Sequence, residues 1–214
     1  SGDEQQHRCL HIRASVGLRR EETFQGRKHF VYPVVALAEG VIWPVNAASP
    51  ELVRAEVLAK APAGWNGRPV FQSHPKINGQ LVSGNIPELL ESAAYGIIFN
   101  TNSGSDILAT RRLKFEVWLD PEKAKEVPNA ARAMERMDAG ETVEVSVGVF
   151  TILKKVGGIF NGKRYDAEWA EITQDHFAIL NENETGACSV EAGCGAPRMA
   201  TLHVLSAAGL FPVD

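Results

Sequence analysis

The residue types that could carry out chemistry centre on one serine within an apolar strand. Residues 143–150 read Val-Glu-Val-Ser-Val-Gly-Val-Phe, so the valines share one face and Ser146 lies on the other. Gly148 shares the serine's face and leaves open space next to the hydroxyl, where a substrate could approach. The strand alone is more typical of an ordinary surface serine on a half-exposed strand, but its pattern also suits a nucleophilic serine.

Two histidines could supply the base that such a serine needs. A serine hydroxyl is a poor nucleophile until a base takes its proton and a third group orients that base. His74 follows an apolar strand and precedes Pro75, which disfavours a helix at that point. His176 begins the apolar run 176–180, so both histidines stand at strand ends and could converge on the serine. The alternative is that they are structural histidines, or that one lies on the surface.

The same histidines allow a second chemistry, because His74 and His176 with Glu171 or Asp175 could bind zinc. The chain contains neither a His-Glu-x-x-His pattern nor a cluster of paired cysteines. We therefore expect neither a metal nor any other cofactor.

The three cysteines are Cys9, Cys188 and Cys194. An odd, low number argues against a disulfide framework and indicates a reducing compartment. The spacing of Cys188 and Cys194 is longer than that of tight zinc knuckles. We expect free thiols in a flexible tail.

Composition and charge narrow the choice of partners. The chain has 214 residues and a net charge of −4, which gives no electrostatic reason to expect nucleic acid or an anionic membrane. No apolar run approaches the ~20 residues of a membrane span. We expect an arm or edge strand over residues 1–28, a main domain over 29–180, and a flexible tail over 181–214 with a short helix near its end.

The elements that must position the candidate residues are short strands with a few helices between them. Ser49-Pro50-Glu51 predicts a helix that runs to about residue 60. We expect a hairpin over 95–119, two helices between 121 and 140, and strands over 143–153 and 165–173. This pattern indicates an α+β fold with an antiparallel sheet or barrel and helices packed outside.

Three of these motifs together resemble a known family. Residues 143–150, with their Ser-hydrophobic-Gly core, resemble the nucleophile strand of tailed-phage prohead (capsid-maturation) serine proteases. Those enzymes are similar to the herpesvirus capsid proteases (assemblin-like), whose triad runs His, Ser, His, as His74, Ser146 and His176 do here. Two further runs resemble a branch of phage head proteins assigned to that superfamily: Trp65-Asn66-Gly67-Arg68-Pro69-Val70 with His74-Pro75, and Asp175-His176-Phe177-Ala178-Ile179. The resemblance covers roughly residues 28–190.

The resemblance implies a closed, mostly antiparallel β-barrel flanked by helices, with a shallow groove for an extended peptide. It implies Ser146 as nucleophile, His74 as base and His176 as third member. The activity would be that of a serine endopeptidase that processes phage scaffold and major capsid proteins, itself included. This would take place in the cytoplasm of the bacterial host, inside assembling proheads, and the enzyme could be a homo-oligomer.

The chain departs from the family at two points. Many prohead proteases use a carboxylate as third member, so Glu171 or Asp175 could replace His176. Relatives carry an Arg-Gly step after this histidine, whereas residues 181–186 read Asn-Glu-Asn-Glu-Thr-Gly, so we expect backbone amides near Gly148 to stabilise an oxyanion. The rival functions are a catalytically inactive head-assembly or decoration protein that keeps the fold, and an unrelated hydrolase of small esters or amides.

Overall fold

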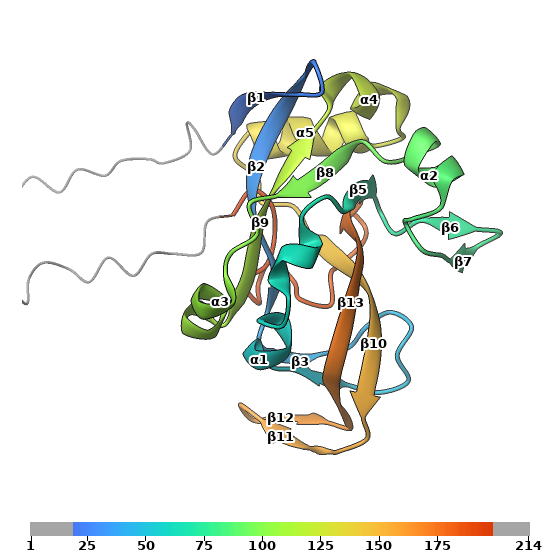
Figure 1. Cartoon of the computed structure of the whole chain (residues 1–214). Coiled ribbons are helices and arrows are strands. Elements are labelled where there is room, and N and C mark those ends of the chain that lie inside the picture. Colours follow the sequence, from blue (N-terminus) through green and yellow to red (C-terminus); the bar gives the residue numbers. More distant parts are fainter. Residues whose placement is uncertain (1–18, 199–214) are drawn as a thin grey trace, which may run out of the picture.

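The computed structural model describes residues 19–198, in which a few short helices are interspersed among the strands (Figure 1). The strands are β1 (Arg20–Phe24), β2 (Arg27–Ala38), β3 (Gly40–Ile42), β4 (Glu51–Val53), β5 (Pro69–Gln72), β6 (Lys76–Ile77), β7 (Gln80–Leu81), β8 (Gly96–Phe99), β9 (Arg112–Leu119), β10 (Val145–Lys154), β11 (Gly158–Phe160), β12 (Lys163–Tyr165) and β13 (Ala167–Ile179). The helices are α1 (Ala55–Leu58), the 3₁₀ turn η1 (Pro62–Trp65), α2 (Pro87–Ser92), α3 (Gly104–Thr110), α4 (Pro121–Glu126) and α5 (Ala130–Asp138). None of the helices in this part of the chain is long and apolar enough to cross a membrane.

A nine-stranded mixed sheet forms the centre of the fold. Its strand order is β1-β2-β9-β8-β5-β13-β4-β3, and β10 pairs with β13 off this path. The sheet does not close, so the expected closed antiparallel barrel is wrong. The sheet is also mixed and not antiparallel throughout, because β13 runs parallel to β4 through its first residues and parallel to β5 through its last. The sequence predicts a helix, and no strand, over the residues of β4, so it gives β13 no partner there.

The residues of β4 account for that error. Ser49-Pro50-Glu51 predicts a helix start, yet Glu51, Leu52 and Val53 are all buried in the sheet, and α1 covers only Ala55–Leu58. Trp169 Nε1 donates a hydrogen bond of 2.6 Å to the Glu51 carboxylate, which is buried beside it. Strand pairing and this buried contact therefore override the local helix-start signal.

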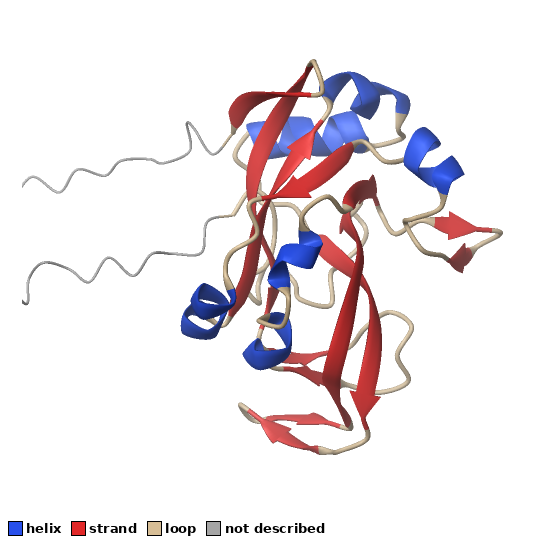
Figure 2. Ribbon diagram, in the orientation of Figure 1, coloured by secondary structure: helices blue, strands red, loops and turns tan. Residues whose placement is uncertain are grey.

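The hydrophobic core contains side chains from strands β2, β8, β9 and β13 and from helices α1, α4 and α5. Figure 2 shows how these strands and helices are arranged. The aromatic rings of Trp65 and Phe115 lie 5.8 Å apart, and Phe115 lies 5.1 Å from Phe177 on β13. Helix α5 buries Ala133 and other small or sulfur-containing side chains on one face. The expected hairpin is present as β8 and β9, although α3 replaces the expected turn between them.

Residues 181–198, which we expect from the sequence to form a flexible tail, pack against the sheet. Backbone bridges join Val35 to Gly195 and Val143 to Ala196. A disulfide joins Cys188 to Cys194, and both cysteines are buried. The expectation of free thiols is therefore wrong for this pair, because counting cysteines cannot show that the chain turns back on itself between them.

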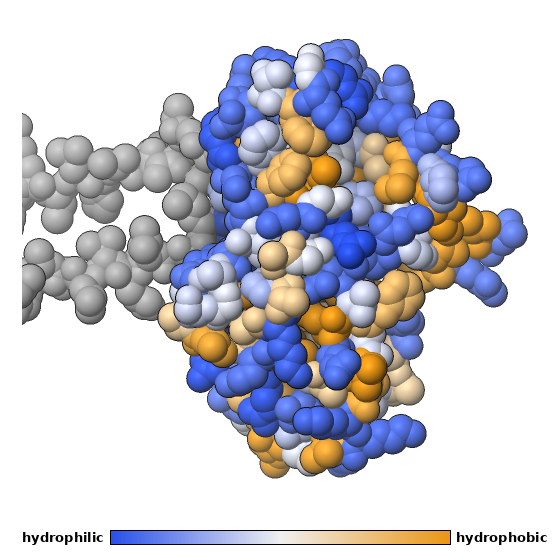
Figure 3. Space-filling model, in the orientation of Figure 1, coloured by the Kyte–Doolittle hydropathy of each residue, from blue (hydrophilic) through white to orange (hydrophobic). Residues whose placement is uncertain are grey.

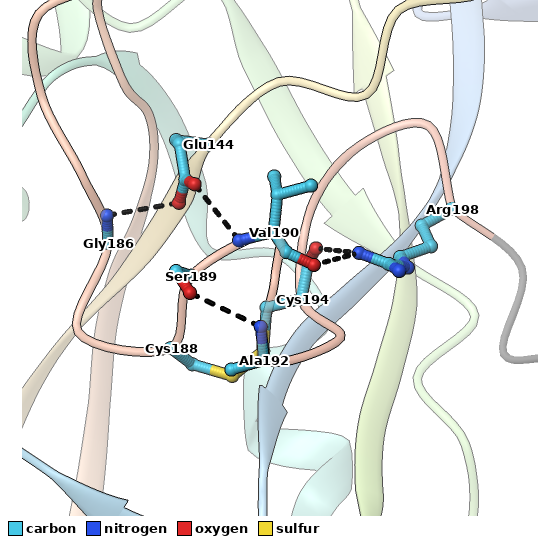
Figure 4. The surroundings of a disulfide bond; sticks show 8 residues. All are labelled: Glu144, Gly186, Cys188, Ser189, Val190, Ala192, Cys194 and Arg198. Atoms are coloured by element: carbon cyan, nitrogen blue, oxygen red, sulfur yellow. Dashed lines mark hydrogen bonds between the residues drawn. A yellow bond between two sulfur atoms is a disulfide. The ribbon is translucent and has the colours of Figure 1, made fainter.

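The carboxylate of Glu144, just before β10, holds this disulfide loop in place (Figure 4). It accepts hydrogen bonds of 3.1 Å from the Gly186 amide and 2.9 Å from the Val190 amide. The loop turns at Gly193, whose φ of +100° favours glycine. Cys9, residues 1–18 of the expected arm and residues 199–214 of the expected tail lie outside the described residues.

Candidate active site

Three neighbouring strands bring the predicted site residues together. In the antiparallel pair of β10 and β13, Ser146 stands opposite Ala178, and Gly148 stands opposite His176. Strand β5 lies beside the end of β13, where Gln72 pairs with Ile179, and His74 follows two residues later. Pairing within the sheet therefore positions all three candidate residues at one place, although they are far apart in the chain.

The side chains of these residues form a continuous line of hydrogen bonds. His74 Nε2 lies 2.8 Å from Ser146 Oγ, and His74 Nδ1 lies 2.8 Å from His176 Nε2. His176 is thus on the side of the His74 ring that faces away from the serine. The two imidazole rings meet edge to face, with an interplanar angle of 78°. The geometry is that of a nucleophile, a base and an orienting group.

Asp175 extends the line by one residue. Its Oδ2 atom lies 2.6 Å from His176 Nδ1, and it also accepts hydrogen bonds from Ser83 Oγ (2.5 Å), the Gly84 amide (2.7 Å) and Asn85 Nδ2 (2.7 Å). Burial opposes ionisation of Asp175, but the hydrogen bonds from Ser83, His176 and Gly84 outweigh it and hold the pKa of the carboxyl below its usual value. Asp175 therefore remains an acceptor at neutral pH.

A β-bulge explains how two adjacent residues on β13 can contact each other. Consecutive side chains on a regular strand point to opposite faces. Here Gly148 pairs with His176 and Val149 pairs with Gln174, so Asp175 has no partner on β10. An extra residue of this kind re-aims the neighbouring side chains, which allows Asp175 to reach the His176 ring.

Gly148 has a different role from the one the sequence suggested. A Cβ atom at this position would lie 2.0 Å from Cε1 of His176. The space beside the serine is thus filled by the imidazole of His176, and only glycine leaves room for that ring. The sequence pattern found the right glycine, but the space serves the third member and not the approaching substrate.

Burial keeps both histidines uncharged. Burial and the neighbouring His176 lower the pKa of His74 to about 4, while the negative charge of Glu184 acts in the opposite direction. Burial also lowers the pKa of His176, against the raising effect of Asp175. At neutral pH His74 therefore has a lone pair with which to accept the serine proton.

The two carboxylates that were alternatives for the third member lie at different places. Glu171 is exposed on β13 opposite Ile152, well before His176 along the strand, and makes no hydrogen bond to either histidine. Asp175 contacts His176 and not His74, so it adds a fourth member instead of replacing the third. Across residues 19–198, no three His, Cys, Asp or Glu side chains gather closely enough to hold a metal ion. His29 is buried on β2, where its ring bonds to the Arg27 carbonyl.

A groove of about 640 Å³ runs along β10 beside Ser146. Its lining includes apolar side chains from several elements: Leu37, Ile42, Pro44, Val45, Val149 and Trp169. Val45 and Phe150 on its border are 81% and 60% exposed, which shows that the groove is open to solvent. The β6–β7 hairpin contributes Lys76 and Leu81 at one end, and apolar surface gathers over that hairpin at the right of Figure 3.

The backbone of β10 also offers a donor near the serine. The Leu180 amide donates to the Glu144 carbonyl across the pair of strands. Because hydrogen-bonded and non-hydrogen-bonded pairs alternate, the amides of Ser146 and Gly148 face β13 and that of Val147 faces away from it. Val147 follows Ser146 in the chain, and its amide is therefore the donor beside the serine that points away from β13.

No protein-family model, curated protein or solved structure matches this chain. The interpretation of the site therefore depends on the geometry of its residues.

Proposed function

We propose that the chain is a serine endopeptidase with Ser146 as nucleophile, His74 as general base and His176 as the group that orients the base. The observation that carries the proposal is the unbroken line of hydrogen bonds from Ser146 through His74 and His176 to Asp175. Each contact has the length of a good hydrogen bond. A decoration protein without catalysis would have no need to keep two buried, uncharged histidines in this order.

The proposed reaction has two halves. Ser146 Oγ attacks the carbonyl carbon of the scissile peptide bond while His74 Nε2 takes its proton. The resulting imidazolium of His74 is stabilised by the lone pair of His176, which Asp175 polarises from the other side. His74 then gives the proton to the leaving amine, and a water molecule, activated by the same base, releases the acyl group from Ser146. The Val147 amide is our candidate donor to the oxyanion.

The groove supports an extended polypeptide as substrate. Within residues 19–198, β10 pairs with β13 alone, so its other edge borders an open, largely apolar groove. A polypeptide in extended form fits such a surface better than a small ester, which favours an enclosed pocket. The finer proposal, that the substrates are phage scaffold and capsid proteins with self-cleavage included, derives from the resemblance of residues 65–75, 143–150 and 175–179.

Cleavage of proteins tests this function. We expect the wild-type chain to cut an unfolded protein such as casein, and a co-expressed phage scaffold protein, at internal bonds. Ser146→Ala should lose this cleavage and keep its circular dichroism spectrum, while Ser92→Ala, which changes an exposed serine on α2, should cleave normally. Equal cleavage by Ser146→Ala would end the proposal. Hydrolysis of small esters without cleavage of proteins would leave a serine hydrolase but not an endopeptidase.

A further inference from the structure

The segment that follows β13 is tied to the residue before the base. The amide of Glu184 donates a hydrogen bond of 3.0 Å to the Asn181 carbonyl, which closes a tight turn over residues 181–184. The Glu184 carboxylate accepts a hydrogen bond of 2.9 Å from the Asn181 amide and a short one from Ser73 Oγ. Gln72, the residue before Ser73, donates a hydrogen bond of 3.0 Å from its Nε2 to Asn181 Oδ1. The turn therefore holds the chain at both Gln72 and Ser73.

Ser73 has an unusual backbone conformation that needs such support. Its φ of +64° lies in the left-handed region, which side chains other than glycine, asparagine and aspartate seldom adopt. The Ser73 amide donates a hydrogen bond of 2.7 Å to the Ile179 carbonyl. The left-handed conformation therefore lies at the point where the chain leaves the pairing of β5 with β13. This reversal of the backbone directs the next residue, His74, toward Ser146.

The charge of Glu184 acts on the same base. Burial opposes its ionisation, but the Ser73 and Asn181 hydrogen bonds and the nearby Lys76 and His74 hold the pKa of Glu184 below its usual value. A carboxylate at this place favours the imidazolium of His74 that forms when the serine proton is taken. Glu184 makes no hydrogen bond to His74 or Ser146, so its effect on them passes through its contacts with Ser73 and Asn181 and through its charge.

We infer that Glu184 is a positioning residue for the general base, which holds Ser73 in the left-handed conformation and so aims His74 Nε2 at Ser146 Oγ. The inference rests on the proposed function. It gives a role to the segment 181–186 that stands where the resemblance would place an Arg-Gly step. Glu182, two residues earlier in the same turn, serves as a comparison, because it forms an exposed ion pair with Arg132 on α5.

The kinetics of Ser146 labelling by a fluorophosphonate test the inference. We expect Glu184→Gln to lower the maximal labelling rate by about tenfold, because a small misplacement of the base is costly, with little change in the half-saturating concentration. Ser73→Ala should act in the same direction. Ser73→Asn should keep more of the rate, since asparagine retains a donor and tolerates positive φ. The control Glu182→Gln should label at the wild-type rate, and all variants should melt within a few degrees of it.

Each other outcome contradicts the inference in a distinct way. An unchanged rate for Glu184→Gln, with the wild type labelled normally, would end the positioning role and leave the proposed function intact. A higher half-saturating concentration with an unchanged maximal rate would mean that Glu184 only lines the groove and does not position the base. If the wild type is not labelled at all, the proposed function fails. NMR then decides the inference, which requires that Glu184→Gln, but not Glu182→Gln, shifts the ring resonances of His74.

Discussion

The proton positions in the candidate site follow from one buried carboxylate. Because Asp175 is ionised, the facing Nδ1 of His176 must carry a proton, and its Nε2 is then a lone pair. His74 must therefore carry its proton on Nδ1, which leaves the Nε2 lone pair directed at Ser146. A single carboxylate thus sets the tautomers of both histidines, and each is the one that a general base at His74 requires.

The two histidines should differ in their contribution to the rate. His74→Ala removes the group that transfers the proton, so we expect a fall of about 1000-fold or more in peptide cleavage. His176→Ala removes only an orienting contact and should cost about 10- to 100-fold. Asp175→Asn should cost no more than His176→Ala, because Asp175 acts through that ring. Glu171→Gln, on the exposed face of β13, is the control and should cleave normally.

Rates measured with a single peptide substrate under the same conditions would decide the order. A larger loss for Asp175→Asn or Glu171→Gln than for His176→Ala would mean that a carboxylate is the functional third member.

The dependence of activity on pH should reflect the environment of His74. Burial lowers its pKa to about 4, and only the neutral ring can accept the serine proton. The rate of Ser146 labelling should therefore rise through about pH 4 and be level by about pH 6, well below the limb expected for a histidine with the usual pKa of about 6.5. The same burial should lower the stability of the fold as the pH falls below about 6.5. In this range His74 is protonated in the unfolded chain but stays neutral in the folded one.

Labelling rates across this range, with circular dichroism at each pH to confirm that the chain is folded, would check the midpoint. A midpoint at about 6.5 or higher in the folded protein would show that His74 is not the buried, neutral base described here.

At the scale of elements, the bulge in β13 and the glycine in β10 together position the His176 ring. The bulge lets Asp175 reach His176, and Gly148 leaves room for the ring. Gly148→Ala should push the imidazole away from His74 and lower the cleavage rate by at least about tenfold. Gly157→Ala is the matched control, because its added Cβ atom would lie 3.3 Å from its nearest neighbour, the Tyr165 carbonyl oxygen, far from the site. A crystal structure of Gly148→Ala with an unmoved His176 and full activity would contradict this account.

The sequence predicted those parts of the site that depend on near neighbours in the chain. The alternation of valines placed Ser146 on the face opposite the core, and Pro75 correctly kept His74 out of a helix. The bulge at Asp175 could not be predicted, because it is defined by the register with β10. The cradle of Ser83, Gly84 and Asn85 also escaped notice, since no local pattern ties that loop to a carboxylate some ninety residues away.

At the scale of the whole molecule, the same limit explains the wrong expectation of a barrel. Whether a sheet closes depends on which strands pair across long stretches of chain, and the parallel pairing of β13 with β4 and β5 left no signal in either segment alone. The open sheet has a consequence for function, because within the described residues β10 is left with β13 as its only partner strand. In the proposed function, a polypeptide substrate binds along this edge of β10 and the groove beside it.

The most direct test of the central claim is covalent labelling of Ser146 followed by intact mass and peptide mapping. Incubation with a fluorophosphonate at neutral pH should add a single adduct to the wild-type chain, located on Ser146. Ser146→Ala should gain none, and His74→Ala should react about 100-fold or more slowly, because the hydroxyl then lacks its base. A wild-type chain that stays unlabelled, or an adduct that forms equally fast on Ser146→Ala, would contradict the assignment of Ser146 as an activated nucleophile.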